Sequence, residues 1–227
     1  IGSTFETAFG IPAWVMGVVL VIICGFIFLG GVRRLASVCE KLVPLMAGVF
    51  LLGGLVVLAL RIRYIPTTFG MIFKYAFMPQ AIIGGAFGAA IKAAISQGAK
   101  RGLFSNEAGM GSTPHAHAQA NVMHPHEQGV VAMVGVFIDT FIVLTMTALV
   151  ILTSGMLGTT GADGQMLTAT ALAQAAFNHS FGSFGSVFVA VCLLFFAFST
   201  IIGWYFFGES NVKALFGGSK KATKKHE

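Results

Sequence analysis

The stretch GAKRGLFSNEAGMGST, residues 98–113, lies between hydrophobic segments that are long enough to cross a bilayer. In this stretch a basic pair, Lys100 and Arg101, is followed by Asn106, Glu107 and glycines. Charged, amide and glycine residues in such close sequence favour a structured junction at a membrane face over a featureless linker. The apolar segments on either side give the protein class, and this junction narrows it.

The composition is that of an integral membrane protein. The chain has 227 residues, of which 56% are hydrophobic and only 10% are charged, whereas soluble domains contain about 25% charged residues. With a mean hydropathy of +0.86, it cannot assemble a soluble core with a polar surface. The net charge of +6 therefore does not indicate nucleic-acid binding. The chain begins with Ile1 rather than Met, so we expect a fragment of a longer protein or an incomplete product.

Five apolar segments predict an all-α, polytopic membrane protein. Each is long enough to cross about 30 Å of hydrocarbon, and together they occupy residues 11–31, 42–60, 69–95, 128–154 and 184–208. The third segment is interrupted by Pro79, Gly84 and Gly85, and the fourth contains Asp139 near its middle.

The basic residues predict the orientation. Ten of the 14 Lys and Arg residues lie in loops on one side of this arrangement or in the lysine-rich tail, 210–227, and only Arg61 and Arg63 lie in the opposite loops. Because cytoplasmic loops carry an excess of Lys and Arg, the N-terminus is predicted to be outside and the tail cytoplasmic. The loop 155–183 is then extracellular, with a short surface helix expected from Met166 to Phe177.

The interrupted third segment is a candidate binding site. Pro79 removes a backbone donor, and Gly84 with Gly85 weakens the helix, so backbone groups would be exposed at bilayer depth unless protein or a ligand satisfies them. Broken helices of this kind form substrate and ion sites in secondary transporters. The alternative is that the glycines only allow close helix packing.

The fifth segment contains Ser199, Thr200 and Trp204. Adjacent hydroxyl groups can offer oxygen ligands to Na⁺, and Trp204 shares a helical face with Thr200. The alternative is that the hydroxyl groups bond back to the preceding turn. From the residue types alone, back-bonding is the better supported of the two interpretations.

Asp139 and Glu107 are the acidic candidates. A carboxylate in the middle of a span is costly to bury unless it is paired, so Asp139 is either functional or a hydrogen-bond acceptor for the adjacent loop, and the second role is favoured. Glu107 is interpreted as an anchor at a helix start or in a loop, because no partner base is fixed near it in the sequence.

Four histidines occur as His115-x-His117 and His124-x-His126. Such spacing suggests a zinc site, but no HExxH motif is present. A polar loop that happens to contain histidines is the favoured interpretation, and a metalloenzyme is a remote one.

Several segments together resemble the sodium:alanine (alanine or glycine:cation) symporter family. The most specific is KRGLFSNEAGMGSTPHAHA at 100–118, and the similarity extends to Glu209. Further matching segments are FETAFGIP at 5–12, GGVRRLASVCEKLVP at 30–44, FMPQAIIGGAFGA at 77–89, HPHEQGVVAMVGVFIDT at 124–140, ALVILTSG at 148–155 and LFFAFSTIIGWYFFGE at 194–209.

This resemblance implies a leucine-transporter-like inverted-repeat fold, of which residues 1–209 would supply the fourth to eighth helices. The broken third segment with Gly84 and Gly85 would help to form the amino-acid site. The fifth segment would offer the carbonyl oxygen of Phe196 and the hydroxyl groups of Ser199 and Thr200 to sodium. Thr200 and Trp204 would border the amino-acid pocket.

The implied function is sodium-coupled symport of a small neutral amino acid, alanine or glycine, across the plasma membrane by alternating access. Sodium would be the co-transported ion, with no organic cofactor, no enzymatic activity and no nucleic-acid partner. The first broken helix of the family, with its GTGN motif, has no counterpart in these residues, so the N-terminal half of a symporter is expected to be required. The alternative is a membrane remnant or scaffold that does not transport.

Overall fold

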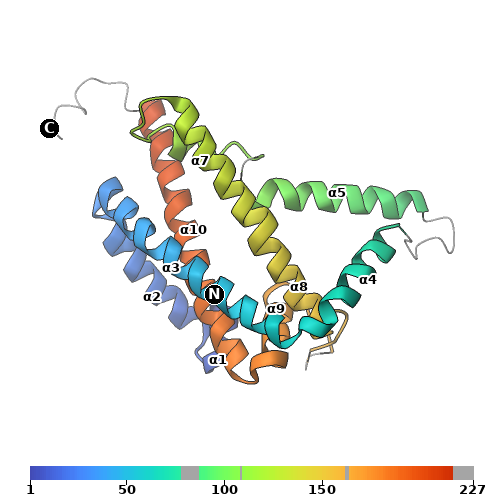
Figure 1. Cartoon of the computed structure of the whole chain (residues 1–227). Helices are drawn as coiled ribbons and strands as arrows, with labels where there is room; N and C mark the ends of the chain where they lie inside the picture. Colours follow the sequence, from blue (N-terminus) through green and yellow to red (C-terminus); the bar gives the residue numbers. More distant parts are fainter. Residues whose placement is uncertain (78–86, 108, 162–163, 217–227) are drawn as a thin grey trace.

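The computed structural model describes residues 1–77, 87–107, 109–161 and 164–216, and Figure 1 shows that this part of the chain is built from helices. The α-helices are α1 (Gly2–Phe9), α2 (Ala13–Phe28), α3 (Gly31–Leu60), α4 (Ile65–Phe77), α5 (Phe87–Ser105), α6 (Thr113–His117), α7 (Pro125–Phe137), α8 (Leu144–Ser154), α9 (Ala169–Phe181) and α10 (Phe184–Phe216). A 3₁₀ turn, η1 (Ile62–Tyr64), precedes α4, and a π-helix, η3 (Ile138–Val143), joins α7 to α8. The prediction of an all-α protein is confirmed.

Three helical stretches of the described chain are long and apolar enough to cross a membrane: Arg34–Leu60, Pro125–Ser154 and Phe184–Phe216. The apolar helix α2 has 16 residues, which at a rise of 1.5 Å per residue gives about 24 Å, less than the hydrocarbon thickness. The chain is a multi-pass membrane protein, and the count of five spans stays a prediction.

Helix α3 begins at Gly31, well before the predicted start of the second span at residue 42. Gly31 adopts a φ of +69°, which makes a tight turn directly after α2. Arg34 then donates from Nη1 to the carbonyl oxygen of Phe26 at 3.0 Å, and its guanidinium lies 4.1 Å from the centre of the Phe26 ring. The segment predicted as a loop is therefore helical, and Arg34 is held at the helix corner by these two contacts.

The third predicted span, 69–95, consists in its described parts of α4 and α5, which run in different directions. Figure 1 shows α5 extending sideways from the middle of the long α7–α8 helix, whereas α4 rises beside α8. Residues 78–86, which include Gly84 and Gly85, lie outside the described residues.

Helix α10 continues to Phe216, beyond the predicted end of the fifth span at residue 208. Glu209 and Lys213 form an ion pair one turn apart on this extension. Pairs at this spacing stabilise helices, so the helix outlasts the apolar run that predicted it.

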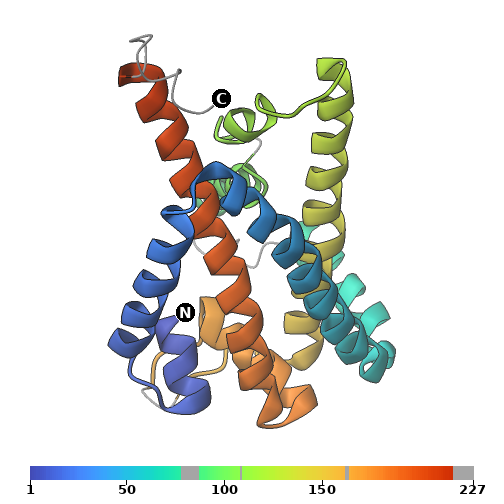
Figure 2. The ribbon, with the colours of Figure 1, turned by 90° about the vertical axis from the view of Figure 1, so that its left-hand side faces the viewer.

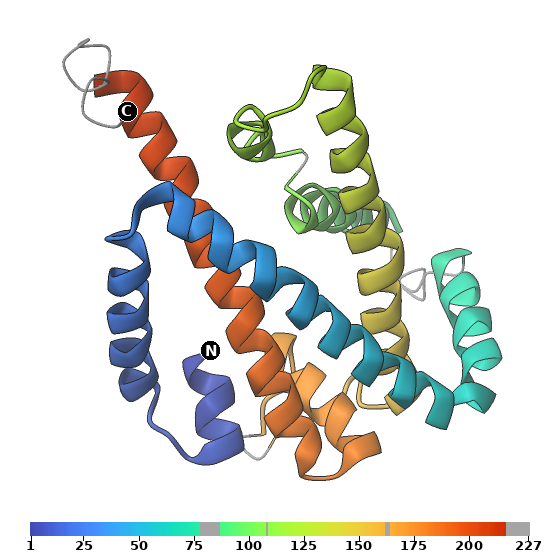
Figure 3. The ribbon, with the colours of Figure 1, turned by 60° about the vertical axis from the view of Figure 1, so that its left-hand side comes forward.

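The core lies where α10 packs against its neighbours. Figure 3 shows α10 crossing α3 and running beside α9. One cluster of buried side chains joins α3, α8, α9 and α10 and contains Val57, Val150, Ala176, Phe177 and Val189. A second cluster joins α2, α3 and α10 and contains Cys24, Ile27, Leu35, Phe198 and Ile202.

Helix α9 lies inside the loop 155–183, where a surface helix was predicted. The helix is present, but its inner face is buried, since Ala176 and Phe177 are 0% and 1% exposed. The amide nitrogen of Gln174 donates to the carbonyl oxygens of Thr4 and Ser186 at 3.2 and 3.4 Å. This helix therefore packs against α1 and α10 rather than lying free on the surface.

The two ends of the molecule differ in the elements that they gather. Figure 2 shows α6, the start of α7 and the end of α10 at one end, with α1 and α9 at the other. The charge distribution predicts that the end with α6 faces the cytoplasm.

Candidate functional site

The hydroxyl groups of Ser199 and Thr200 both lie 2.9 Å from the carbonyl oxygen of Phe196 and donate to it. This convergence follows from helix geometry, because residues three and four positions on overlie the same carbonyl. We call these three atoms the α10 oxygen cluster. The structure thus brings together the three oxygen atoms that the resemblance assigns to sodium.

Helix α3 covers one side of the α10 oxygen cluster. Ser199 Oγ lies 3.6 Å from Met46 Sδ, and the Phe196 ring meets the edge of Phe50 with centroids 5.4 Å apart. The side chain of Thr200 is exposed on the other side of the helix. The cluster is therefore supported by α3 on one flank and accessible on the other.

Trp204 lies one turn beyond Thr200 on the same face of α10 and is 44% exposed. Its ring meets Phe207 at 5.8 Å, nearly edge-on. Thr200 and Trp204 thus form a continuous exposed strip beside the oxygen cluster. The role of this strip in binding an amino acid stays a prediction.

The hydrogen bonds to Phe196 match the back-bonding interpretation of the two hydroxyl groups. They do not conflict with cation binding, because a hydroxyl group that donates its proton keeps lone pairs that can act as ligands. The geometry is therefore compatible with both interpretations. The other predicted binding residues, Gly84 and Gly85, lie outside the described part of the chain.

Asp139 contacts the polar junction at residues 98–113. Ser105, the last residue of α5, donates a 2.8 Å hydrogen bond to Asp139 Oδ2. The amide of Asn106 donates to the hydroxyl of Thr140 at 3.1 Å. The favoured interpretation of Asp139, as a hydrogen-bond acceptor, is confirmed, but its donor is the last residue of α5 rather than a loop residue.

The contact falls on the π-helix η3, which contains both Asp139 and Thr140. Single π turns inside α-helices are frequent at functional sites. Ser105 and Thr140 were not predicted as partners from the sequence. One sequence feature could have suggested these hydrogen bonds: each of the two segments carries two adjacent polar residues, Ser105-Asn106 and Asp139-Thr140.

Glu107 anchors the loop that follows α5. Its carboxylate accepts a 3.0 Å hydrogen bond from the hydroxyl of Ser112, and its carbonyl oxygen accepts from the backbone N–H of Met110 at 3.1 Å. Its φ of +58° marks a tight turn. This confirms that Glu107 is a loop anchor.

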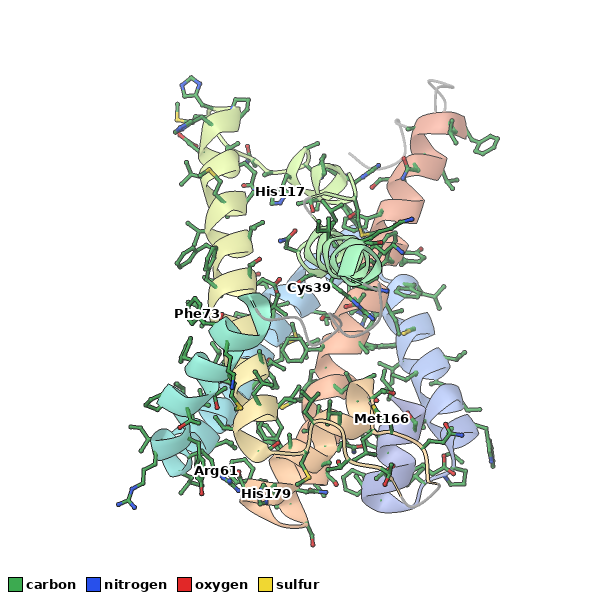
Figure 4. The ribbon with its side chains drawn as sticks, turned by 90° about the vertical axis from the view of Figure 1, so that its right-hand side faces the viewer. Cys39, Arg61, Phe73, His117, Met166 and His179 are labelled. Carbon is green, nitrogen blue, oxygen red and sulfur yellow. The ribbon has the colours of Figure 1, made fainter. Side chains whose placement is uncertain are left out.

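The two histidines of α6 have separate partners. His115 contacts Asn211 of α10, with 3.2 Å between Nε2 and Oδ1, whereas His117 contacts Gln128 of α7, with 2.6 Å between Nδ1 and Nε2. Among the described residues, no three His, Cys, Asp or Glu side chains are grouped to hold a metal ion. Figure 4 shows His117 on α6, between α7 and α10.

A cavity of about 410 Å³ lies between α3, α10 and the loop around α6. Its walls are mostly apolar, and they are formed by Leu35, Ala36, Cys39, Ala116, Gln119, Ala120, Ile202, Gly203, Phe206 and Phe207. The α10 side of this cavity thus begins at Ile202, close along the helix to the exposed strip.

The sequence profile described as the sodium:alanine symporter family matches residues 1–226. The chain is 40% identical over 226 residues to the putative sodium/proton-dependent alanine carrier protein YrbD of Bacillus subtilis (strain 168). The aligned region covers 96% of this chain and 46% of that protein.

Two further relatives show the same pattern. The sodium/alanine symporter AgcS of Methanococcus maripaludis is 41% identical over 217 residues, covering 96% of this chain and 46% of that protein. The probable sodium/glutamine symporter GlnT of B. subtilis is 39% identical over 215 residues, covering 95% and 43%. The chain spans about half the length of the curated relatives that it matches.

Proposed function

Because the chain belongs to the sodium:alanine symporter family, we propose that it forms part of a sodium-coupled symporter of small neutral amino acids in the plasma membrane. In this proposal the described helices belong to a leucine-transporter-like inverted repeat, of which five spans are present. Sodium and the amino acid bind at an unwound site, and rocking of one helical bundle exposes that site to either side in turn.

The observation that best supports this function is the α10 oxygen cluster. Sodium is a hard cation and prefers oxygen ligands, of which about six are expected by analogy with other hard cations. Phe196, Ser199 and Thr200 offer three, and both hydroxyl groups lie within hydrogen-bond distance of the Phe196 carbonyl oxygen. The remaining ligands would come from the bound amino acid and from segments outside the described residues.

Alanine or glycine is the proposed substrate. The exposed strip places an indole ring one turn from the proposed sodium ligand Thr200, so Trp204 would limit the volume open to the substrate side chain. The names of the relatives YrbD and AgcS refer to alanine, and that of GlnT to glutamine. The substrate test must therefore compare amino acids whose side chains differ in size.

Reconstitution of the complete transporter tests the proposal. An inward sodium gradient should drive accumulation of labelled alanine in proteoliposomes, and replacing sodium by potassium should abolish it. Unlabelled glycine should compete and a large amino acid such as leucine should not. Alanine uptake that is equal in sodium and potassium would contradict sodium coupling.

A further inference from the structure

The loop around α6, residues 112–120, is fastened to the end of α10 by side-chain contacts. Gln119 donates to the hydroxyl of Ser210 at 3.2 Å. The imidazole of His115 lies 3.2 Å from Asn211 Oδ1 and packs against Phe207 with ring centroids 5.9 Å apart. We call residues 112–120 the α6 loop.

Both ring nitrogens of His115 face oxygen acceptors. Nδ1 lies 3.0 Å from the carbonyl oxygen of Ser112, and Nε2 lies 3.2 Å from Asn211 Oδ1. A carbonyl oxygen can only accept. The orientation of the Asn211 amide is fixed by its other end, because Nδ2 donates to the carbonyl oxygen of Phe207 at 2.9 Å.

A neutral imidazole carries one N–H and can therefore donate to only one of these two oxygens. Its second nitrogen would then place a lone pair against an acceptor. The protonated ring carries two N–H groups and satisfies both contacts. The protonated ring is thus the form that matches both oxygen acceptors around His115, and histidine is the side chain whose charge ordinarily changes between about pH 5 and 8.

Other ionisable groups also lie around the α6 loop, and several of them have partners other than His115. On α10, Glu209 and Lys213 pair with each other, and Glu107 accepts from Ser112. His117, on α6 itself, contacts Gln128. The remaining ionisable residues on the adjoining ends of α3 and α7 are Arg33, Arg34, Cys39, Glu40, Lys41, His126 and Glu127, with His124 immediately before α7.

The α6 loop is also a wall of the 410 Å³ cavity, through Ala116, Gln119 and Ala120. The opposite walls belong to α3 and α10, and Cys39 of α3 lines the same space. Figure 4 shows Cys39 below α6 in the view drawn. Movement of the loop away from α10 would therefore open this cavity.

We propose that His115 is a proton-binding site that fastens the α6 loop over the cavity between α3 and α10. Binding of one proton completes the bridge from Ser112 to Asn211 and holds the loop over the cavity. Loss of the proton removes one of the two hydrogen bonds and releases the loop. This inference goes beyond sodium-coupled transport and does not depend on the sodium ligands.

The native thiol of Cys39 reports on the state of the loop. The complete transporter is placed in lipid nanodiscs, where both faces are accessible, and treated with N-ethylmaleimide between pH 5.5 and 8.5. Modification is quantified on the Cys39 peptide by mass spectrometry. Since thiols react faster as the pH rises, each variant is compared with the wild type at the same pH, and the buried Cys24 and Cys192 report on general loosening.

His115→Gln removes the second donor, so Cys39 should react about tenfold faster than in the wild type at pH 5.5. The two proteins should react equally at pH 8.5. Asn211→Asp places a carboxylate beside the ring and should shift the midpoint of wild-type protection to higher pH, because a nearby negative charge favours the protonated ring. His126→Gln, a change at an exposed histidine on the first turn of α7, should match the wild type throughout.

A rate ratio for His115→Gln that is the same at pH 5.5 and 8.5 would overturn the proposal. An Asn211→Asp variant in which the pH midpoint of Cys39 protection is unchanged would also overturn it. This second variant keeps the test decisive if His115→Gln disturbs folding. Because the readout is thiol modification rather than uptake, a negative result leaves the test of sodium coupling unaffected.

Discussion

The hydroxyl of Ser105 donates a 2.8 Å hydrogen bond to Oδ2 of Asp139, and this contact joins residues 34 positions apart in the chain. It ties the end of α5 to the π-helix in the middle of the α7–α8 stretch. A carboxylate in the middle of a span is costly unless it is paired. The contact therefore gives Asp139 a partner and fixes the position of the FSNEAG stretch at the same time.

We predict that Ser105→Ala destabilises the complete transporter, because it leaves the Asp139 carboxylate without this donor. Removal of a partner from a buried polar group costs about 1–3 kcal/mol. Asp139→Asn should cost less, since its amide oxygen can still accept from Ser105. Thermal unfolding in detergent checks both, with Ser3→Ala at an exposed position as the control. Equal midpoints for Ser105→Ala and Ser3→Ala would rule out a stabilising bond.

Gly53 is predicted to be required for close packing of α3 on α10. A Cβ at this position would overlap the Phe188 ring, whereas a Cβ at Gly48 of the same helix meets nothing within 4 Å. Gly53→Ala should therefore lower the unfolding midpoint, and Gly48→Ala should leave it unchanged or raise it slightly, because Ala is the better helix former. Adding Phe188→Leu to the Gly53→Ala variant should partly restore its unfolding midpoint. A Gly53→Ala protein that is as stable as Gly48→Ala would contradict this packing.

Much of the fold could be predicted from hydropathy alone, because apolar runs become helices in a membrane. The stretches 128–154 and 184–208 both lie within observed helices. The ends of the helices were harder to predict from hydropathy. Helix α3 begins at Gly31 because Arg34 bonds back to Phe26, and such a contact between a charged side chain and a backbone carbonyl has no hydropathy signal.

The candidate site was predictable to a similar degree. Spacing along one helix was sufficient to bring Phe196, Ser199 and Thr200 together, since residues three and four apart are neighbours. The link between Ser105 and Asp139 could not be derived in this way, because it depends on how two separate helices meet. The bridge of His115 to Asn211 spans 96 positions and requires the tertiary structure for the same reason.

The predicted orientation can be tested by cysteine labelling of the complete transporter in intact cells. Thr160→Cys lies in the loop before α9 and Leu215→Cys near the end of α10, and both positions are exposed. In a background without native cysteines, an impermeant maleimide should label position 160 and spare position 215, because the basic residues gather at the end with α6. Labelling of position 215 with protection of position 160 would invert the orientation.

Trp204→Phe is predicted to change which amino acids are accepted. The smaller ring would widen the pocket beside Thr200, so uptake of amino acids larger than alanine should rise relative to alanine, with little change in sodium dependence. The matched control is Trp14→Phe, because Trp14 is 72% exposed on α2. Competition assays on normalised protein check the ranking. If both variants keep the wild-type ranking, Trp204 does not border the substrate.

The sodium dependence of uptake by Thr200→Val tests the central claim, that the α10 oxygen cluster binds sodium. Valine keeps the shape of threonine but removes the hydroxyl oxygen. The loss of one oxygen ligand to the bound ion should cost about 1–3 kcal/mol, the range for removal of a polar partner, so the sodium concentration for half-maximal alanine uptake should rise about five- to hundredfold.

The control for this measurement is Thr147→Val on α8, where the hydroxyl donates to the carbonyl oxygen of Val143 at 2.8 Å. It removes the same kind of back-bond away from α10 and should leave the sodium requirement unchanged. The account predicts a raised sodium requirement for Thr200→Val alone. A half-maximal sodium concentration that is the same in Thr200→Val, Thr147→Val and the wild type would contradict it.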